Sequence, residues 1–267
     1  MRIARFAGDD DPRFGVIGDD NGVPTIAVLN GDPLYAGLNL SGQKIPLDDV
    51  RLLAPVIPRS KVVCVGKNYP AHAAEMGGEV PAEPLIFLKP NTSVIGPGDP
   101  IFYPKQSEDV HYEAELAVVI GRICRDVAAE DVARVIFGYT VANDVTARDL
   151  QAKDGQWSRA KGFDTFCPLG PWIETDFDPS NVDVTTRLDS LGGGDELKQN
   201  GSTSDMFFKV PEIIEYISSF MTLLPGDVIL TGTPDGVGPM FPGDKVSVAV
   251  EGIGTLTNPV VSADDSE

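Results

Sequence analysis

The segment from His111 to Glu115 carries the side chains with the clearest capacity for chemistry. It reads His-Tyr-Glu-Ala-Glu and runs into the apolar sequence Leu-Ala-Val-Val-Ile-Gly, which predicts a buried strand. Side chains alternate along a strand, so we expect His111, Glu113 and Glu115 to share one face. Two carboxylates about 5 Å apart repel by about 3 kcal/mol at an effective dielectric of about 20. A solvated strand face is the alternative, but a pair entering a buried segment favours a metal site.

A third ligand is sought among the oxygen donors, because carboxylates suit hard cations such as Mg²⁺ or Mn²⁺. The chain has two histidines and three scattered cysteines, without the CxxC, HxxxH or HExxH spacing of common zinc sites. Asp144 follows an apolar, aromatic segment that ends where polar residues gather. An Asn-Asp pair is also common in turns and helix caps. We expect Asp144 to complete the metal site with Glu113 and Glu115.

A second group of reactive side chains lies in residues 68–78, which predict a short helix with proline in its first turn and glycines at its end. His72 and Glu75 are three residues apart, so the carboxylate can hold the imidazole and fix its tautomer. Such a pair can take a proton from water or return one to a carbanion. An ordinary exposed helix pair is the alternative. The flanking glycines favour a mobile lid that brings His72 over a site.

Composition limits the class of protein. The chain has 267 residues, of which 42% are hydrophobic, and 28 glycines and 22 prolines favour a β-rich fold with many turns. The net charge of −19 argues against nucleic acid or an anionic membrane as partner, but not against a small acidic substrate beside a cation. No apolar run reaches transmembrane length and no signal-peptide pattern is visible. Three unpaired cysteines are typical of the reducing cytoplasm, which we expect as the location.

The organisation predicted is a small N-terminal β domain, a larger catalytic domain and a disordered acidic tail, over residues 1–57, 58–262 and 263–267 respectively. A Gly18–Gly22 turn signal predicts a hairpin in the first of these. An amphipathic helix is predicted over residues 211–222. The strand candidates are apolar segments bounded by turn residues: 14–17, 24–29, 61–66, 85–89, 116–120, 135–141 and 228–230.

Five motifs, in this order, resemble the motif series of the fumarylacetoacetate hydrolase family. They span roughly residues 60–260 and are Lys67-Asn-Tyr-x-x-His-x-x-Glu75, His111-Tyr-Glu-x-Glu-Leu116, Asn143-Asp-Val-Thr-Ala-Arg-Asp149, Lys161-Gly-Phe-Asp-Thr-Phe-Cys-Pro-Leu-Gly-Pro171 and Thr231-Gly-Thr-Pro-x-Gly-Val-Gly-Pro239. The chain is similar to the small bacterial branch described as 2-hydroxyhepta-2,4-diene-1,7-dioate isomerase, which also contains acylpyruvate hydrolases and oxaloacetate decarboxylases. The turn Leu191-Gly-Gly-Gly-Asp195 departs from the Asn-Gly hairpin common in that branch.

The resemblance implies a fold and a set of roles. The fold would be α+β and β-rich, with a mixed, twisted β-roll catalytic domain after a small N-terminal domain, assembled as a homodimer. Mg²⁺ or Mn²⁺ would be held by the same three carboxylates. By matching positions, Lys161 would stabilise an enolate, and three further residues would contact a 2-oxo acid substrate: Arg148, Gln151 and Thr233.

The reaction we expect is hydrolysis of a C–C bond in an acylpyruvate-type 2,4-dioxo acid. His72 and Glu75 would activate water, and pyruvate would leave as an enolate held by the metal. Isomerisation of a diene-dioate or decarboxylation of oxaloacetate at the same site is the first alternative. A metal-dependent dicarboxylate binder without turnover is the second. The resemblance also suggests a role in the catabolism of aromatic compounds.

Overall fold

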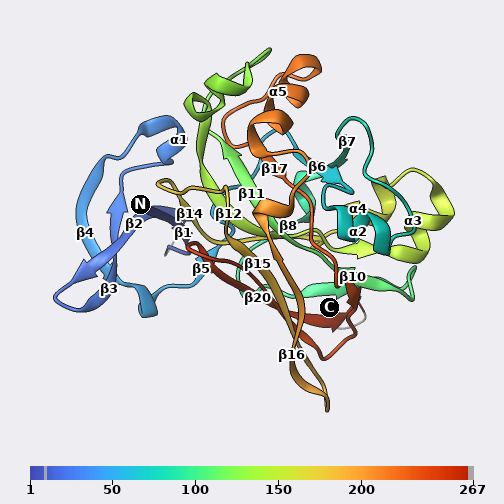
Figure 1. Cartoon of the computed structure of the whole chain (residues 1–267). Helices are drawn as coiled ribbons and strands as arrows, with labels where there is room; N and C mark the ends of the chain where they lie inside the picture. Colours follow the sequence, from blue (N-terminus) through green and yellow to red (C-terminus); the bar gives the residue numbers. More distant parts are fainter. Residues whose placement is uncertain (9–10, 264–267) are drawn as a thin grey trace.

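The computed structural model describes residues 1–8 and 11–263, and these form three β-sheets with a few short helices (Figure 1). Most neighbouring strands are antiparallel, but β6 and β17, β8 and β14, and β9 and β20 are parallel pairs. The predicted β-rich α+β class with mixed sheets is therefore confirmed. The predicted acidic tail, residues 263–267, lies outside the described residues except for Ala263.

The largest sheet has twelve strands and runs through the whole molecule. Its order is β4 (Leu40–Pro46), β3 (Val23–Leu29), β2 (Arg13–Asp20), β1 (Arg2–Phe6), β14 (Cys167–Glu174), β12 (Ile136–Asn143), β11 (Ala114–Ile120), β17 (Val228–Leu230), β6 (Val62–Gly66) and β7 (Leu85–Lys89), with β5 (Leu52–Leu53) on β1 and β8 (Val94–Ile95) on β14.

The N-terminal strands form one end of this sheet. The predicted hairpin is present as β2 and β3, and Asn21 and Gly22 take the left-handed backbone of its turn, with φ of 57° and 88°. Strand β1 pairs with β14, so the N-terminal strands and the larger predicted domain share one sheet. The division of the chain at residue 57 stays a prediction about folding units.

The centre of the sheet is made of the apolar segments that the sequence predicted as strands. All seven residues of β11 are buried, as are the three of β17 and the first four of β6. Strands this apolar are stable only when both faces are covered. One face lies against a five-stranded sheet, since Leu116 and Val118 join Val184 and Val248 in one core cluster. That sheet runs β16 (Gly194–Ser202), β15 (Asp183–Ser190), β19 (Lys245–Val250), β20 (Gly254–Ser262) and β9 (Ile101–Tyr103).

A small third sheet and the helices complete the fold. The sheet joins β13 (Thr146–Ala147), β10 (Val110–Tyr112) and β18 (Gly238–Pro239). The α-helices are α1 (Pro33–Ala36), α2 (Pro70–Glu75), α3 (Arg148–Asp154), α4 (Ser158–Gly162) and α5 (Val210–Phe220), and the 3-10 turns are η1 (Leu47–Asp49), η2 (Asn91–Ser93), η3 (Ala129–Arg134) and η4 (Thr203–Asp205). In Figure 1, α2, α3 and α4 gather on one side of the molecule.

Both helices predicted from the sequence are present. Helix α2 has Pro70 in its first turn and is followed by Gly77 with φ of 72°, as the proline and glycine signals indicate. Helix α5 buries Ile213, Ile214 and Ile217 on the predicted apolar face. No helix among the described residues is both long and apolar enough to cross a membrane.

Candidate active site

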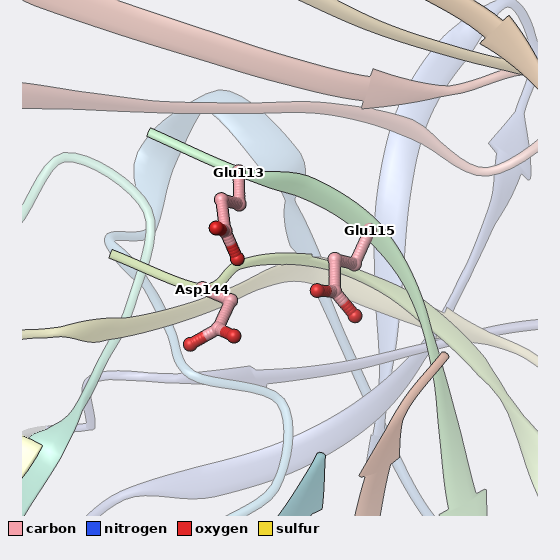
Figure 2. A group of neighbouring side chains, drawn as sticks. All are labelled: Glu113, Glu115 and Asp144. Carbon is pink, nitrogen blue, oxygen red and sulfur yellow. The ribbon is translucent and has the colours of Figure 1, made fainter. Parts of the chain in front are cut away.

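Three carboxylates meet where two neighbouring strands end. Glu113 and Glu115 flank the first residue of β11, and Asp144 directly follows β12. The strands are paired in register through Ala114 and Asn143, and the Asp144 amide donates to the Glu113 carbonyl at 2.9 Å. One oxygen from each carboxylate lies within 4.8 Å of the others, and the three side chains converge in Figure 2. All three residues are at most 3% exposed.

The chain bends at Glu113, which places His111 elsewhere. His111 belongs to β10 in the third sheet, and its Nε2 lies 2.8 Å from the Asp109 carboxylate. It does not line the cavity described below. The expectation that His111 shares a face with the two glutamates is therefore wrong, because strict alternation holds only within an unbroken strand.

Protein cations partly neutralise the three acids. Lys161 Nζ donates to Glu113 Oε2 at 2.7 Å and to Asp144 Oδ2 at 2.6 Å. Lys89, on β7, donates to the other Asp144 oxygen at 2.6 Å, and Arg148 donates to Glu113 Oε1. Both lysines are buried, so they tolerate this position because each is paired with a carboxylate.

The contacts of Glu115 differ from those of Glu113 and Asp144. Its Oε2 accepts from the Gly232 amide at 2.6 Å, and among the described residues no lysine or arginine pairs with it. Burial, together with the negative charges of Asp144 and Glu113, raises its pKa well above the usual value. Burial alone would also raise the pKa of Glu113, but Lys161 and Arg148 lower it below the usual range.

The donor set fits a hard divalent cation. Three buried carboxylates converge, and among the described residues no lysine or arginine forms an ion pair with Glu115. A Mg²⁺ or Mn²⁺ ion among these oxygens would supply a positive charge there, and oxygen ligands are those such ions prefer.

The turn after β17 forms another wall of the site. Thr233 Oγ1 donates to the Ala114 carbonyl at 2.8 Å and accepts from Gln199 Nε2 at 2.8 Å. Gln199 Oε1 accepts from the Ala114 amide at 2.9 Å, so it fixes the backbone between the two glutamates. Gln199 was not foreseen, since it lies on β16, far from the motifs. A buried glutamine in a strand that is otherwise mostly exposed is the only signal, and it requires the structure.

The predicted His72–Glu75 pair is formed. His72 Nδ1 lies 3.0 Å from Glu75 Oε2, and the other Glu75 oxygen accepts from the Gly236 amide at 3.0 Å. His72 is only 5% exposed, so the alternative of an exposed helix pair does not hold. The contact with Glu75 occupies Nδ1 and leaves Nε2 as the nitrogen that can act in the cavity.

One cavity of about 280 Å³ collects these side chains. Of the nine site residues named from the sequence, eight line it. The ninth, Glu75, contacts His72 without lining the cavity itself. The eight are His72, Glu113, Glu115, Asp144, Arg148, Gln151, Lys161 and Thr233. Residues that the sequence reasoning did not single out complete the wall, and the most prominent are Lys67, Met76, Phe87 and Trp157.

The fold is β-rich, and an acidic triad and a buried lysine line one cavity. This is the arrangement of an enzyme active site. A model of the fumarylacetoacetate hydrolase C-terminal domain matches residues 61–261, and a model of the Rv2993c-like N-terminal domain matches residues 1–55. The chain belongs to the fumarylacetoacetate hydrolase family.

Similar proteins cover nearly the whole chain. Protein Rv2993c of Mycobacterium tuberculosis is 53% identical over 98% of both chains. The mitochondrial oxaloacetate tautomerase Fahd2a of Rattus norvegicus is 44% identical, over 81% of this chain and 71% of its own.

Solved structures show the same fold. The 5-carboxymethyl-2-hydroxymuconate delta-isomerase of Mycobacterium smegmatis is 53% identical, with a TM-score of 0.89 over 98% of this chain and 100% of its own. The maleylpyruvate hydrolase of Sphingobium sp. SYK-6, solved with manganese(II) and pyruvate, is 34% identical, with a TM-score of 0.79 over 98% of this chain and 99% of its own. The protein is thus an enzyme of a family whose members act on small organic acids.

Proposed function

We propose that this protein is a Mg²⁺- or Mn²⁺-dependent enzyme that interconverts small 2-oxo acids through their enolates. Tautomerisation or isomerisation of a 2-oxo dicarboxylic acid is the reaction we favour. One observation carries the proposal: the three carboxylates with Lys161, and a histidine held by Glu75, line the same small cavity. Among the relatives named for an activity, the more similar ones are named for isomerase and tautomerase activity.

Stabilisation of the enolate is the first requirement. A divalent cation held by Glu113, Glu115 and Asp144 would supply the positive charge that lowers the cost of removing a proton next to the carbonyl. The Lys161 ammonium, whose pKa is raised despite burial by Asp144 and Glu113, stays charged beside the same carboxylates. It therefore adds a fixed positive charge at the place where negative charge develops on the substrate oxygen.

Three residues would orient the substrate. Arg148 Nη1 donates to Gln151 Oε1 at 3.1 Å, so the two side chains form one polar edge of the cavity. The Thr233 hydroxyl is fixed by Gln199 and Ala114 and offers its remaining lone pair to the cavity. We assign substrate contact to Arg148, Gln151 and Thr233, as the sequence resemblance implied.

Proton transfer is assigned to His72. Glu75 fixes the ring through Nδ1, so Nε2 is the atom that takes a proton from the substrate carbon or returns one to it. The Gly236 amide donates a hydrogen bond to Glu75. This bond connects the α2 helix to the segment that carries Thr233. The histidine and the enolate site are therefore positioned by one connected network.

Hydrolysis of a C–C bond in an acylpyruvate is the second candidate. The same His72–Glu75 pair can activate a water molecule, and the 34% identical maleylpyruvate hydrolase shares the fold. This was the reaction favoured from the sequence. It takes second place here because the isomerase and the tautomerase are more similar to this chain.

The test is a substrate panel with the Mg²⁺- or Mn²⁺-loaded protein. Enolic oxaloacetate, acylpyruvates and diene-dioates are followed by ultraviolet absorbance, and products are identified by mass spectrometry. Tautomerisation predicts loss of the enol absorbance in H₂O without change of mass, as the keto form appears, and exchange of C3 hydrogens in D₂O. Hydrolysis predicts a gain of water and release of pyruvate, and decarboxylation predicts loss of CO₂. Tight oxalate binding with no product from any acid would indicate the non-catalytic binder.

We further propose a cytoplasmic homodimer. Cys64, Cys124 and Cys167 are all free thiols, which fits a reducing compartment. The homodimer is carried over from the family resemblance. Light scattering coupled to size exclusion would measure the mass directly, and a mass of 28.5 kDa would contradict the dimer.

A further inference from the structure

Lys67 is the one cationic side chain of the cavity that the proposed reaction has not used. It lines the same cavity as the acidic triad and is half-buried. Among the described residues, no carboxylate pairs with its ammonium group. Arg148 and Lys161, by contrast, are both paired with Glu113. A lysine that lines a cavity without a carboxylate partner is free to pair with an anionic ligand there, and this points to such a ligand.

The backbone at Lys67 is built to hold this position. Its φ is +56°, a left-handed conformation that a residue with a side chain adopts at a cost. The next residue, Asn68, is held on both sides. Its Nδ2 donates to the carbonyls of Phe208 and Thr231 at 3.0 and 2.8 Å, and its Oδ1 accepts from the Phe208 amide at 2.8 Å. The conformation of Lys67 is therefore fixed by its neighbours.

The chain also leaves room for the ammonium group. Gly78 follows α2, and a Cβ atom placed there would lie 3.0 Å from Lys67 Nζ. The Lys67 ammonium therefore lies close to the backbone of Gly78. The backbone of Lys67 is fixed, and its side chain extends from there past Gly78 along the cavity wall.

The charges of the site fit a substrate with two carboxylates. With a divalent cation bound, Glu113, Glu115 and Asp144 would carry three negative charges, and Lys89, Arg148 and Lys161 carry three positive ones. A bound divalent cation adds two, which the carboxylate and enolate oxygen of a 2-oxo acid would balance. Lys67 adds one more, with which a second carboxylate of the substrate could pair directly.

We infer that Lys67 binds the distal carboxylate of the substrate and makes the enzyme selective for 2-oxo dicarboxylic acids over 2-oxo monocarboxylic acids. This rests on the proposed function and assigns the residue that selects for its substrate class. Lys67 would act as a specificity-determining residue of the cavity, while Met76, Phe87 and Trp157 give that cavity its apolar lining.

The test compares Lys67→Met with Lys67→Arg and wild type. Loss of one charge-assisted hydrogen bond predicts a rise of about ten- to a hundredfold in KM for oxaloacetate in Lys67→Met. The inhibition constant of oxalate, which is too short to reach beyond the metal end, should change less than about threefold. Lys67→Arg keeps the charge and should keep part of the preference. Lys153→Met, an exposed lysine on α3 outside the cavity, controls for general loss of charge.

The outcomes separate this inference from the proposed function. Equal changes for oxaloacetate and oxalate in Lys67→Met, or no change in either, would overturn the role of Lys67. Failure of the Mn²⁺-loaded wild type to bind oxalate by calorimetry would overturn the proposed function itself. Thermal unfolding of each variant shows whether the fold is kept, and Lys67→Gln, which also removes the charge, carries the test if Lys67→Met is unstable.

Discussion

Glu115 is the carboxylate of the site with the least help from protein cations, so it depends most on a metal ion. Glu115→Gln keeps the shape and can still accept from the Gly232 amide, but it removes the charge that a divalent cation needs. We expect Mn²⁺ affinity and activity to fall by about a hundredfold or more, a larger loss than for a residue that only supports a ligand. Calorimetry with Mn²⁺ measures the affinity, and circular dichroism checks the fold.

The matched control is Glu130→Gln, which removes an exposed carboxylate in η3. It should leave metal affinity and activity unchanged. Wild-type activity of Glu115→Gln after treatment with a chelator would show that the metal site lies elsewhere.

His72 separates the competing reactions. Enolisation and hydrolysis both need a group that moves a proton, and loss of such a group typically slows a reaction by about a hundred- to ten-thousandfold. Decarboxylation of oxaloacetate needs mainly electron withdrawal at the 2-oxo end. His72→Ala should therefore nearly abolish tautomerisation or acylpyruvate cleavage and retain a sizeable part of any decarboxylation, as steady-state rates on each substrate would show.

Glu75→Ala should shift the rates in the same direction but less, because Glu75 orients the imidazole and does not carry the proton. Small and equal losses of all activities in His72→Ala would contradict the assignment of this pair.

At the scale of elements, the junction between β6 and α2 determines where both Lys67 and His72 lie. Asn68 is 1% exposed and forms three side-chain hydrogen bonds to the loop before α5 and the end of β17. Asn68→Ala leaves buried backbone groups without partners, which costs about 1–3 kcal/mol of unfolding free energy. We also expect lower kcat, because the start of α2 loses its anchor.

Urea unfolding measures the stability, and Asn200→Ala on the exposed part of β16 is the control, with an expected change within about 0.5 kcal/mol. Lower stability without any change in kcat would show that Asn68 supports the fold but does not position α2.

The elements also show what the sequence could predict. Strands such as β6, β7, β11 and β17 were foreseen because their apolar residues and turn boundaries are local properties of the chain. The bend at Glu113 was not foreseen, since it depends on β10 pairing with β13 and β18 in another sheet. Pairing between distant segments leaves little trace in a single sequence.

In the site, too, residues in local motifs could be predicted, whereas pairings between distant segments could not. The carboxylates, His72 and Lys161 stand in recognisable motifs, whereas Lys89 stands at the end of an apolar strand without one. A buried lysine requires a carboxylate partner, but the sequence does not show that Lys89 is buried, since β7 is otherwise partly exposed. Its partner, Asp144, is distant in sequence, so the pairing itself required the fold.

At the scale of the whole molecule, the large sheet joins the N-terminal strands to the site. Strand β1 pairs with β14, β14 with β12, and β12 with β11, so an unbroken series of paired strands runs from the N-terminal hairpin to the acidic triad. The family match to residues 1–55 covers strands β1 to β5, and the match to residues 61–261 covers the other strands of this sheet and the two smaller sheets. The sheet that positions the site therefore includes strands outside the domain that carries the site residues.

The unpaired positive charge in the cavity has a consequence for how substrate arrives. The chain has a net charge of −19, and a divalent cation would change this only to −17 (−19 + 2), so a dianion is repelled during diffusion and attracted only near the mouth of the cavity. Salt screens the long-range repulsion more than the short-range attraction, since the Debye length falls from about 30 Å at 0.01 M to about 8 Å at 0.15 M. We expect kcat/KM for a dicarboxylate to rise with a non-coordinating salt while kcat stays constant, measured by initial rates. A fall would mean that the field of the cavity already governs the encounter at a distance.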